Sequence, residues 1–95
     1  MKISNESDKL KYSNVWVVAE LLSGKIQPVT HELIGVARSL ADARRSEVWV
    51  VVLGSGVAGQ AGELFSYGAD KAIVVDDLRL KGFVDEIEAR VMVRL

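Results

Sequence analysis

The sequence contains no cysteine, one proline and one histidine among its 95 residues. Without cysteine there can be no disulfide framework, no thiolate nucleophile and no cysteine-ligated metal. Twelve basic and 13 acidic residues give a formal net charge of -1, so the chain has no broad basic surface for binding nucleic-acid phosphates. The remaining composition, 49% hydrophobic and 26% charged, is typical of one globular domain or part of one.

Long apolar runs are also absent. The longest, Val48 to Leu53, is far shorter than the roughly 20 residues that span a bilayer, so we expect no membrane insertion. Residues 1–13 are polar and lack the apolar centre of a signal peptide, and we expect them to form a flexible polar arm. The folded part is expected at 14–95, in the cytoplasm of a bacterium or archaeon or in a mitochondrial matrix.

Strand and helix patterns alternate three times along this folded part. Three apolar runs, Val15–Ala19, Val48–Leu53 and Ala72–Val75, predict strands of a parallel sheet that is covered on both faces. Helical spacing predicts a helix from Pro28 to about Asp42 and a short one at about Ala58–Tyr67. A third helix is predicted from apolar residues at helical spacing, namely Leu80, Phe83, Val84, Ile87, Val91 and Leu95.

This order predicts an α/β fold, a three-stranded parallel sheet with flanking helices that forms half of a doubly wound domain. In such a domain the first strand, Val15–Ala19, would lie at the broken edge of the half-sheet. Unpaired backbone groups on an edge strand attract other chains, so we expect self-association through this strand.

A glycine motif follows the second strand: Gly54, Gly56 and Gly59 form G-x-G-x-x-G around Ser55. One interpretation is a nucleotide-binding loop that faces a pyrophosphate, with Asp76, after the next strand, on the ribose. The other is a tight strand-to-helix turn that requires small residues. The motif normally follows the first strand of its domain, and here it follows the second, which favours the turn.

Other polar and aromatic residues have structural explanations. His31 lacks the second histidine of a His-Glu-x-x-His zinc motif and is expected on the surface of a helix's first turn. Asp77 is expected to cap the next helix rather than share a metal with Asp76. Trp16 and Trp49 are expected to pack within the sheet. We therefore predict no catalytic residues and no metal ligands.

Three stretches together resemble the amino-terminal domain of the electron-transfer flavoprotein alpha subunit. They are VVAELLSGKIQPVTHELIGVARSLA, VVLGSGV and YGADKAIVVDD, which match the family pattern in order and spacing from about Val17 to Asp77. The resemblance implies a fold like that of adenine-nucleotide alpha hydrolases and a largely structural Gly-Ser-Gly turn. The stretch after Asp77 departs from the pattern, and the chain stops before the flavin-binding domain.

The resemblance implies a scaffold and subunit-docking segment of an electron carrier, not an enzyme. In the complete complex, FAD would carry electrons from dehydrogenases to a quinone reductase or other acceptor, and AMP, where present, would lie in the beta subunit. No flavin-contacting residue of the family can be assigned to these 95 positions. Two alternatives stay open: a small nucleotide-binding module that uses Gly54–Gly59 and Asp76, and a self-contained interaction domain.

Overall fold

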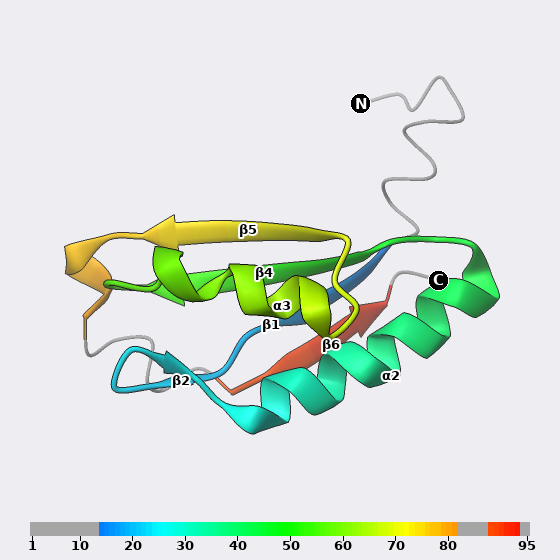
Figure 1. Ribbon diagram of the computed structural model, residues 1–95, viewed down its shortest axis with the longest axis horizontal. Helices are drawn as coiled ribbons and strands as arrows, with labels where there is room; N and C mark the ends of the chain where they lie inside the picture. Colours follow the sequence, from blue (N-terminus) through cyan, green and yellow to red (C-terminus); the bar gives the residue numbers. More distant parts are fainter. Residues whose placement is uncertain (1–13, 82–87, 94–95) are drawn as a thin grey trace, which may run out of the picture.

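The computed structural model describes residues 14–81 and 88–93 (Figure 1). Its elements, in chain order, are β1 (Val15–Val18), β2 (Leu21–Leu22), β3 (Lys25–Ile26), α2 (Pro28–Arg44), β4 (Val48–Gly54), the 3-10 turn η1 (Ala58–Gln60), α3 (Gly62–Ser66), β5 (Lys71–Asp76), the 3-10 turn η2 (Leu78–Leu80) and β6 (Arg90–Val93). None of the helices in these ranges combines the length and apolarity needed to cross a membrane. The expected arm, 1–13, lies outside the described residues.

A four-stranded sheet of order β5-β4-β1-β6 forms the centre of the fold. β4 pairs in parallel with β1 on one side and with β5 on the other. The α/β class and the three parallel strands are therefore confirmed, with β4 between β1 and β5. The short strands β2 and β3 form a separate antiparallel hairpin whose turn contains Ser23 and Gly24.

The prediction of a third helix is wrong for Arg90–Val93, which form β6 and pair antiparallel with β1. Val91 and Val93 alternate with the exposed Arg90 and Met92, and this period of two fits a strand. Pairing with β6 also satisfies backbone groups of β1 that an edge strand would leave free. The expectation of a free edge at the first strand is thus wrong. Because β1 has a partner strand on each side, it offers no free edge for self-association. Leu80, where the predicted helix would begin, ends the 3-10 turn η2, and residues 82–87 and 94–95 lie outside the described residues.

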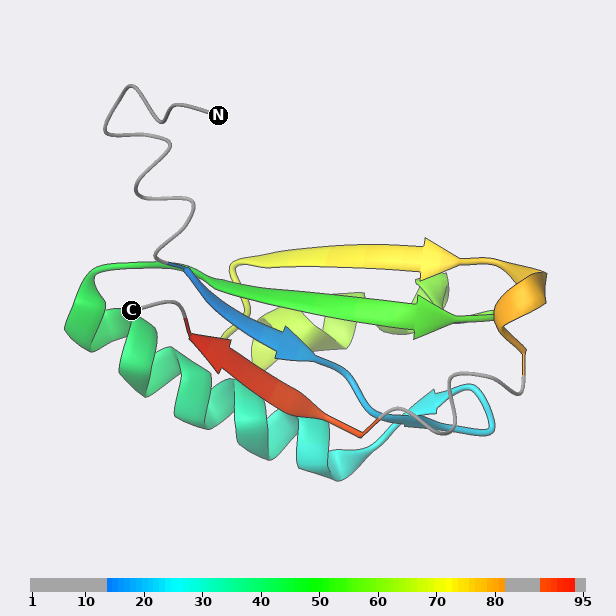
Figure 2. The ribbon, with the colours of Figure 1, turned by 180° about the vertical axis from the view of Figure 1, so that it is seen from behind.

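The described helices α2 and α3 lie on the same face of the sheet, as the front and back views show (Figures 1 and 2). The buried side chains of α2, which are Thr30, Ile34, Ala37 and Ala41, recur at helical spacing. They pack with Leu64 of α3 against the alternate strand residues that face them, Val15, Val17, Val48, Val50 and Val52. Burial of these apolar side chains is the main stabilising contribution to the fold.

The other side of the sheet is not covered by any helix in the described part of the chain, so the expectation of two covered faces is wrong for these residues. The residues that alternate with the core positions form this surface, here called the open face: Trp16, Val18, Trp49, Val51, Leu53, Lys71, Ile73, Val75, Arg90 and Met92. Trp16 and Trp49 are register partners with ring centroids 5.1 Å apart, which agrees with their expected packing role.

Arg38 of α2 connects the helical layer to the strand connections. Its Nη1 donates to the Gly68 carbonyl at 3.1 Å and to Asp70 Oδ2 at 2.6 Å, and its Nη2 donates to the Ser46 carbonyl at 3.3 Å. Asp70 Oδ2 also accepts the N–H of Val48 at 2.8 Å. One guanidinium therefore holds the end of α2, the start of β4 and the turn before β5 together.

Candidate functional site

The glycine corner, residues 54–59, lies at the carboxyl end of β4, beside the end of β5. Gly54 and Asp76 are register partners across this edge. A Cβ atom on Gly54 would lie 2.8 Å from Cγ1 of the buried Val57, so this position requires glycine for close packing. Gly56 has φ +71°, which favours glycine for conformational reasons. These two glycines give the chain a sharp turn at the sheet edge.

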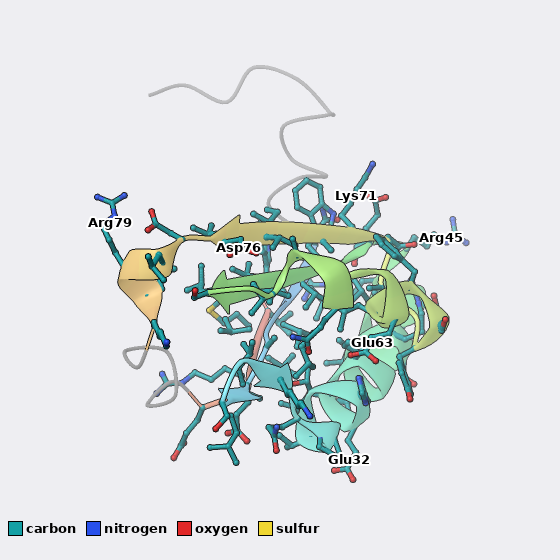
Figure 3. All side chains as sticks on the ribbon, turned by 60° about the vertical axis from the view of Figure 1, so that its left-hand side comes forward. Glu32, Arg45, Glu63, Lys71, Asp76 and Arg79 are labelled. Atoms are coloured by element: carbon teal, nitrogen blue, oxygen red, sulfur yellow. The ribbon has the colours of Figure 1, made fainter. Side chains whose placement is uncertain are left out.

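Three consecutive backbone N–H groups of this corner point at the carboxylate of Asp76. Gly56 donates to Oδ1 at 2.8 Å, and Val57 and Ala58 donate to Oδ2 at 3.0 Å each. The hydrogen bond from Ala58, with those from Gly56 and Val57, holds the pKa of Asp76 below its ordinary value, although neighbouring Asp77 opposes this. Figure 3 labels Asp76 at the end of β5.

This arrangement differs from the one that a nucleotide would use. Donors that would face a pyrophosphate already have an anionic acceptor within the chain. A phosphate at the same place would have to displace a carboxylate of the same charge sign. Asp76 is therefore brought to the loop, as the sequence suggested, but as the loop's own acceptor. Gly59 is exposed, and no atom of the described part of the chain lies within 4 Å of the position that a Cβ would take there.

Gln60, which the sequence patterns did not single out, joins the corner to the β2–β3 hairpin. Its Oε1 accepts the N–H of Ile26 at 2.9 Å, and its Nε2 donates to the carbonyl of Gly24. Gly24 lies close to the corner, because a Cβ there would be 3.7 Å from the Ser55 carbonyl oxygen. The hairpin and the corner thus form one unit, through contacts between residues 34 and 36 positions apart.

The second aspartate of the pair acts separately. The side chain of Asp77 accepts the N–H of Arg79 at 2.9 Å and caps η2, so the expected capping role is confirmed for this 3-10 turn. Asp77 Oδ2 also receives Arg79 Nη2 at 2.7 Å in an exposed ion pair. Within 14–81 and 88–93, no cluster of three or more histidine, aspartate or glutamate residues could hold a metal ion.

His31 differs from the expected surface position. Its side chain is 18% exposed and lies between the two helices, where its ring stacks on Tyr67 with centroids 3.9 Å apart and planes 5° from parallel. Its buried Nε2 has no hydrogen-bond partner among the residues that the structure describes and lies 3.8 Å from Oε1 of Glu63. The histidine therefore packs α2 against α3. The position of His31 in the first turn of its helix does not indicate that Tyr67, 36 residues later, is its stacking partner.

The sequence profile of the electron transfer flavoprotein domain matches residues 15–95 of this chain. A lactate dehydrogenase (NAD(+),ferredoxin) subunit LctC of Acetobacterium woodii is 41% identical over 90% of the chain and 20% of that protein. An electron transfer flavoprotein subunit alpha of Megasphaera elsdenii is 38% identical over 90% of the chain and 25% of that protein. An acryloyl-CoA reductase electron transfer subunit beta of Anaerotignum propionicum is 39% identical over 93% of the chain and 24% of that protein.

The chain thus spans a fifth to a quarter of the length of these relatives. The profile match covers the three parallel strands, the glycine corner and β6. The resemblance to the alpha subunit is confirmed by the Megasphaera protein and by further alpha subunits at 36% and 34% identity. The chain belongs to the electron transfer flavoprotein domain family.

Proposed function

We propose that this chain is the amino-terminal scaffold and docking segment of an electron transfer flavoprotein alpha subunit. In the complete complex, FAD would take electrons from dehydrogenases and pass them to a quinone reductase or other acceptor. The names of the relatives support an electron-transfer role, because they include two alpha subunits and an electron transfer subunit of a reductase. The segment itself would position other parts of the complex and would carry no electron.

The observation that carries the scaffold assignment is the contact between Asp76 and the glycine corner. Binding of FAD or AMP through this corner would require free N–H donors for the phosphates. The donors of Gly56, Val57 and Ala58 face the Asp76 carboxylate instead. The corner therefore fits a phosphate poorly, and we assign FAD to other parts of the complex and AMP, where present, to the beta subunit.

A flavin-binding test separates a scaffold from a flavoprotein. The purified chain is mixed with FAD, passed through a gel-filtration column and measured for flavin absorbance in the protein peak. We expect no flavin absorbance with the protein. Stoichiometric yellow colour would contradict the proposal. A full-length alpha subunit of the family in complex with its beta subunit serves as the positive control.

The nucleotide-binding alternative has its own test. Calorimetric titration of the chain with AMP, ATP and NAD should give no saturable heat. Micromolar affinity that is lost in Gly56→Val would support a nucleotide module, because valine is strained at φ +71° and would distort the corner. Gly59→Val is the matched control, since this exposed position has open space for a side chain.

The docking part of the proposal is tested with the beta subunit. Co-expression of this chain with a beta subunit from the same organism, followed by affinity purification, should recover both chains together. Recovery of this chain alone, in a folded state by circular dichroism, would contradict docking and would leave the self-contained interaction domain as the better interpretation.

A further inference from the structure

His31 is the one histidine of the chain, and its Nε2 atom is buried at the contact between α2 and α3. Among the described residues this nitrogen has no hydrogen-bond partner. A buried polar atom that has lost water and gained no partner destabilises a fold. Neutral imidazole has one N–H donor and one acceptor nitrogen, and Nε2 is unpaired in either role. The contact between the two helices therefore contains a titratable group whose neutral form is poorly satisfied.

Two groups on the α3 side favour a positive charge on this ring. Oε1 of Glu63, in the first turn of α3, lies 3.8 Å from Nε2. The ring of Tyr67 is parallel to the imidazole within 5°, with centroids 3.9 Å apart, and the face of an aromatic ring attracts a cation. Protonation makes both nitrogens of an imidazole donors, so Nε2 would then have a carboxylate acceptor beside it.

The other elements around the ring contribute less charge. The positive end of the α2 dipole disfavours a cation in the first turn. Arg38 lies about two turns further along α2, but its charge is paired with Asp42 and Asp70. Glu32, the next residue on α2, is exposed, and Figure 3 labels it at the outer end of that helix. The strand residues that pack under α2 are apolar. In the described part of the chain, Glu63 is thus the carboxylate paired with the histidine.

We propose that His31 and Glu63 form a pH-sensitive latch between α2 and α3, which closes when the imidazole is protonated. A charge-assisted hydrogen bond from nitrogen to a carboxylate is about 2.7–2.9 Å long, so the two atoms must approach by about 1 Å. The Glu63 side chain is 46% exposed, which leaves it free to rotate into this contact. Histidine changes its charge between about pH 5 and 8, where glutamate is ionised over nearly the whole range. The latch therefore closes as the pH falls through this range and opens as it rises.

The latch acts on the segment that follows the glycine corner. α3 comes directly after η1, and Gln60 of η1 holds the β2–β3 hairpin through Ile26 and Gly24. A closed latch fastens α3, the corner and the hairpin to α2 as one unit. The inference concerns this part of the fold and does not depend on the electron-transfer role.

The test is urea unfolding of the 95-residue chain at about pH 8 and about pH 5.5, on either side of the histidine titration. His31→Phe gives the background, because phenylalanine keeps an aromatic ring beside Tyr67 and does not titrate. The charged histidine gains a partner in the folded state, so its stabilisation is present at the lower pH and lost at the higher. Relative to His31→Phe, we expect acidification to raise the folding equilibrium constant of the original chain by about two- to fivefold. No increase, or a decrease, would overturn the proposal.

Two further variants identify the partner of the histidine. Glu63→Gln keeps the size of the side chain and removes its charge, so the increase on acidification should be largely lost. Glu32→Gln is the matched control, because it removes an exposed carboxylate from α2 and should retain the increase. If His31→Phe does not fold by circular dichroism, these two variants carry the test, since both keep the histidine. Equal increases in Glu63→Gln and in the original chain would overturn the proposal.

Discussion

At the scale of single residues, Gly35 and Gly68 are used in different ways. Gly35 lies inside α2 and is exposed, and within 14–81 and 88–93 no atom lies within 4 Å of the position that a Cβ would take there. Gly68 lies between α3 and β5 with φ +118°, and a Cβ there would lie 3.3 Å from Cδ of Arg38. Gly35 therefore destabilises the helix locally, whereas Gly68 permits a backbone conformation that other residues rarely adopt.

Alanine substitutions at the two glycines should therefore change stability in opposite directions. We expect Gly35→Ala to raise the free energy of unfolding by about 0.5–1 kcal/mol, because alanine is the better helix former. Gly68→Ala should lower it by about 1–3 kcal/mol, because the residue is strained and crowds Arg38. Urea denaturation followed by circular dichroism measures both values. Equal effects of the two variants would contradict this assignment.

At the scale of elements, the guanidinium of Arg38 links three segments that are distant in the sequence. The hydrogen bonds that Arg38 donates to Asp70 and to Asp42 raise the pKa of Arg38 above its ordinary value, although burial lowers it. The side chains of Arg38 and Asp70 are 29% and 36% exposed, so water screens part of the attraction.

Replacement of Arg38 tests this connection. We expect Arg38→Met to lower the free energy of unfolding by about 1–2 kcal/mol, because the Gly68 and Ser46 carbonyls and Asp70 lose a shared donor. Arg79→Met is the matched control: its exposed ion pair joins residues within one turn, and the expected change is within about 0.5 kcal/mol. A double-mutant cycle with Asp70→Ala should show coupling between residues 38 and 70. Purely additive effects would contradict it.

Elements with a strong local pattern could be predicted from the sequence. The observed α2, Pro28–Arg44, begins at the expected proline, and β4 and β5 contain the expected apolar runs. β6 could not be predicted, because Val91 fits both a helical series and a strand alternation, and pairing with β1 favours the strand. The β2–β3 hairpin depends on Gln60, a contact that no local pattern reveals.

The candidate site was predicted only in part, for a related reason. G-x-G-x-x-G and the later Asp76 place both groups at one sheet edge, and they do meet there. The direction of the carboxylate toward the N–H groups depends on the register of β4 and β5, which the sequence does not state. The sequence therefore allows Asp76 to bind a ribose, whereas in the fold Asp76 accepts hydrogen bonds from the N–H groups of the glycine corner.

At the scale of the whole molecule, three aspartates make stability depend on pH. The pKa of Asp76 lies below its ordinary value of 3.8 because of the N–H groups of the corner. Burial raises the pKa of Asp70, but the hydrogen bonds from the Val48 N–H and from Arg38 lower it by more, so the pKa lies below its ordinary value. The pKa of Asp77 is lowered by the side chain and the N–H of Arg79. Each folded-state pKa is thus below the unfolded value, and each carboxylate stabilises the fold only while it is ionised.

Stability should consequently be nearly constant with respect to these three groups above the ordinary pKa of 3.8 and should fall as the pH drops through the folded-state values. We expect Asp76→Asn to be less stable than the original chain at neutral pH and to lose less further stability on acidification. Urea midpoints measured from neutral pH to about pH 2 test this. Parallel curves for the two proteins would show that Asp76 contributes nothing through its charge.

The antiparallel pairing of β6 with β1 brings Val93 opposite Val15. The backbone thus enters the sheet and leaves it at neighbouring points, on strands about 4.8 Å apart. A host protein could therefore carry residues 15–93 within one of its surface loops by opening a gap only about one strand spacing wide. Joining the two points by a short linker, with new termini placed in the Ser23-Gly24 turn, would likewise leave the pairing of the four central strands intact.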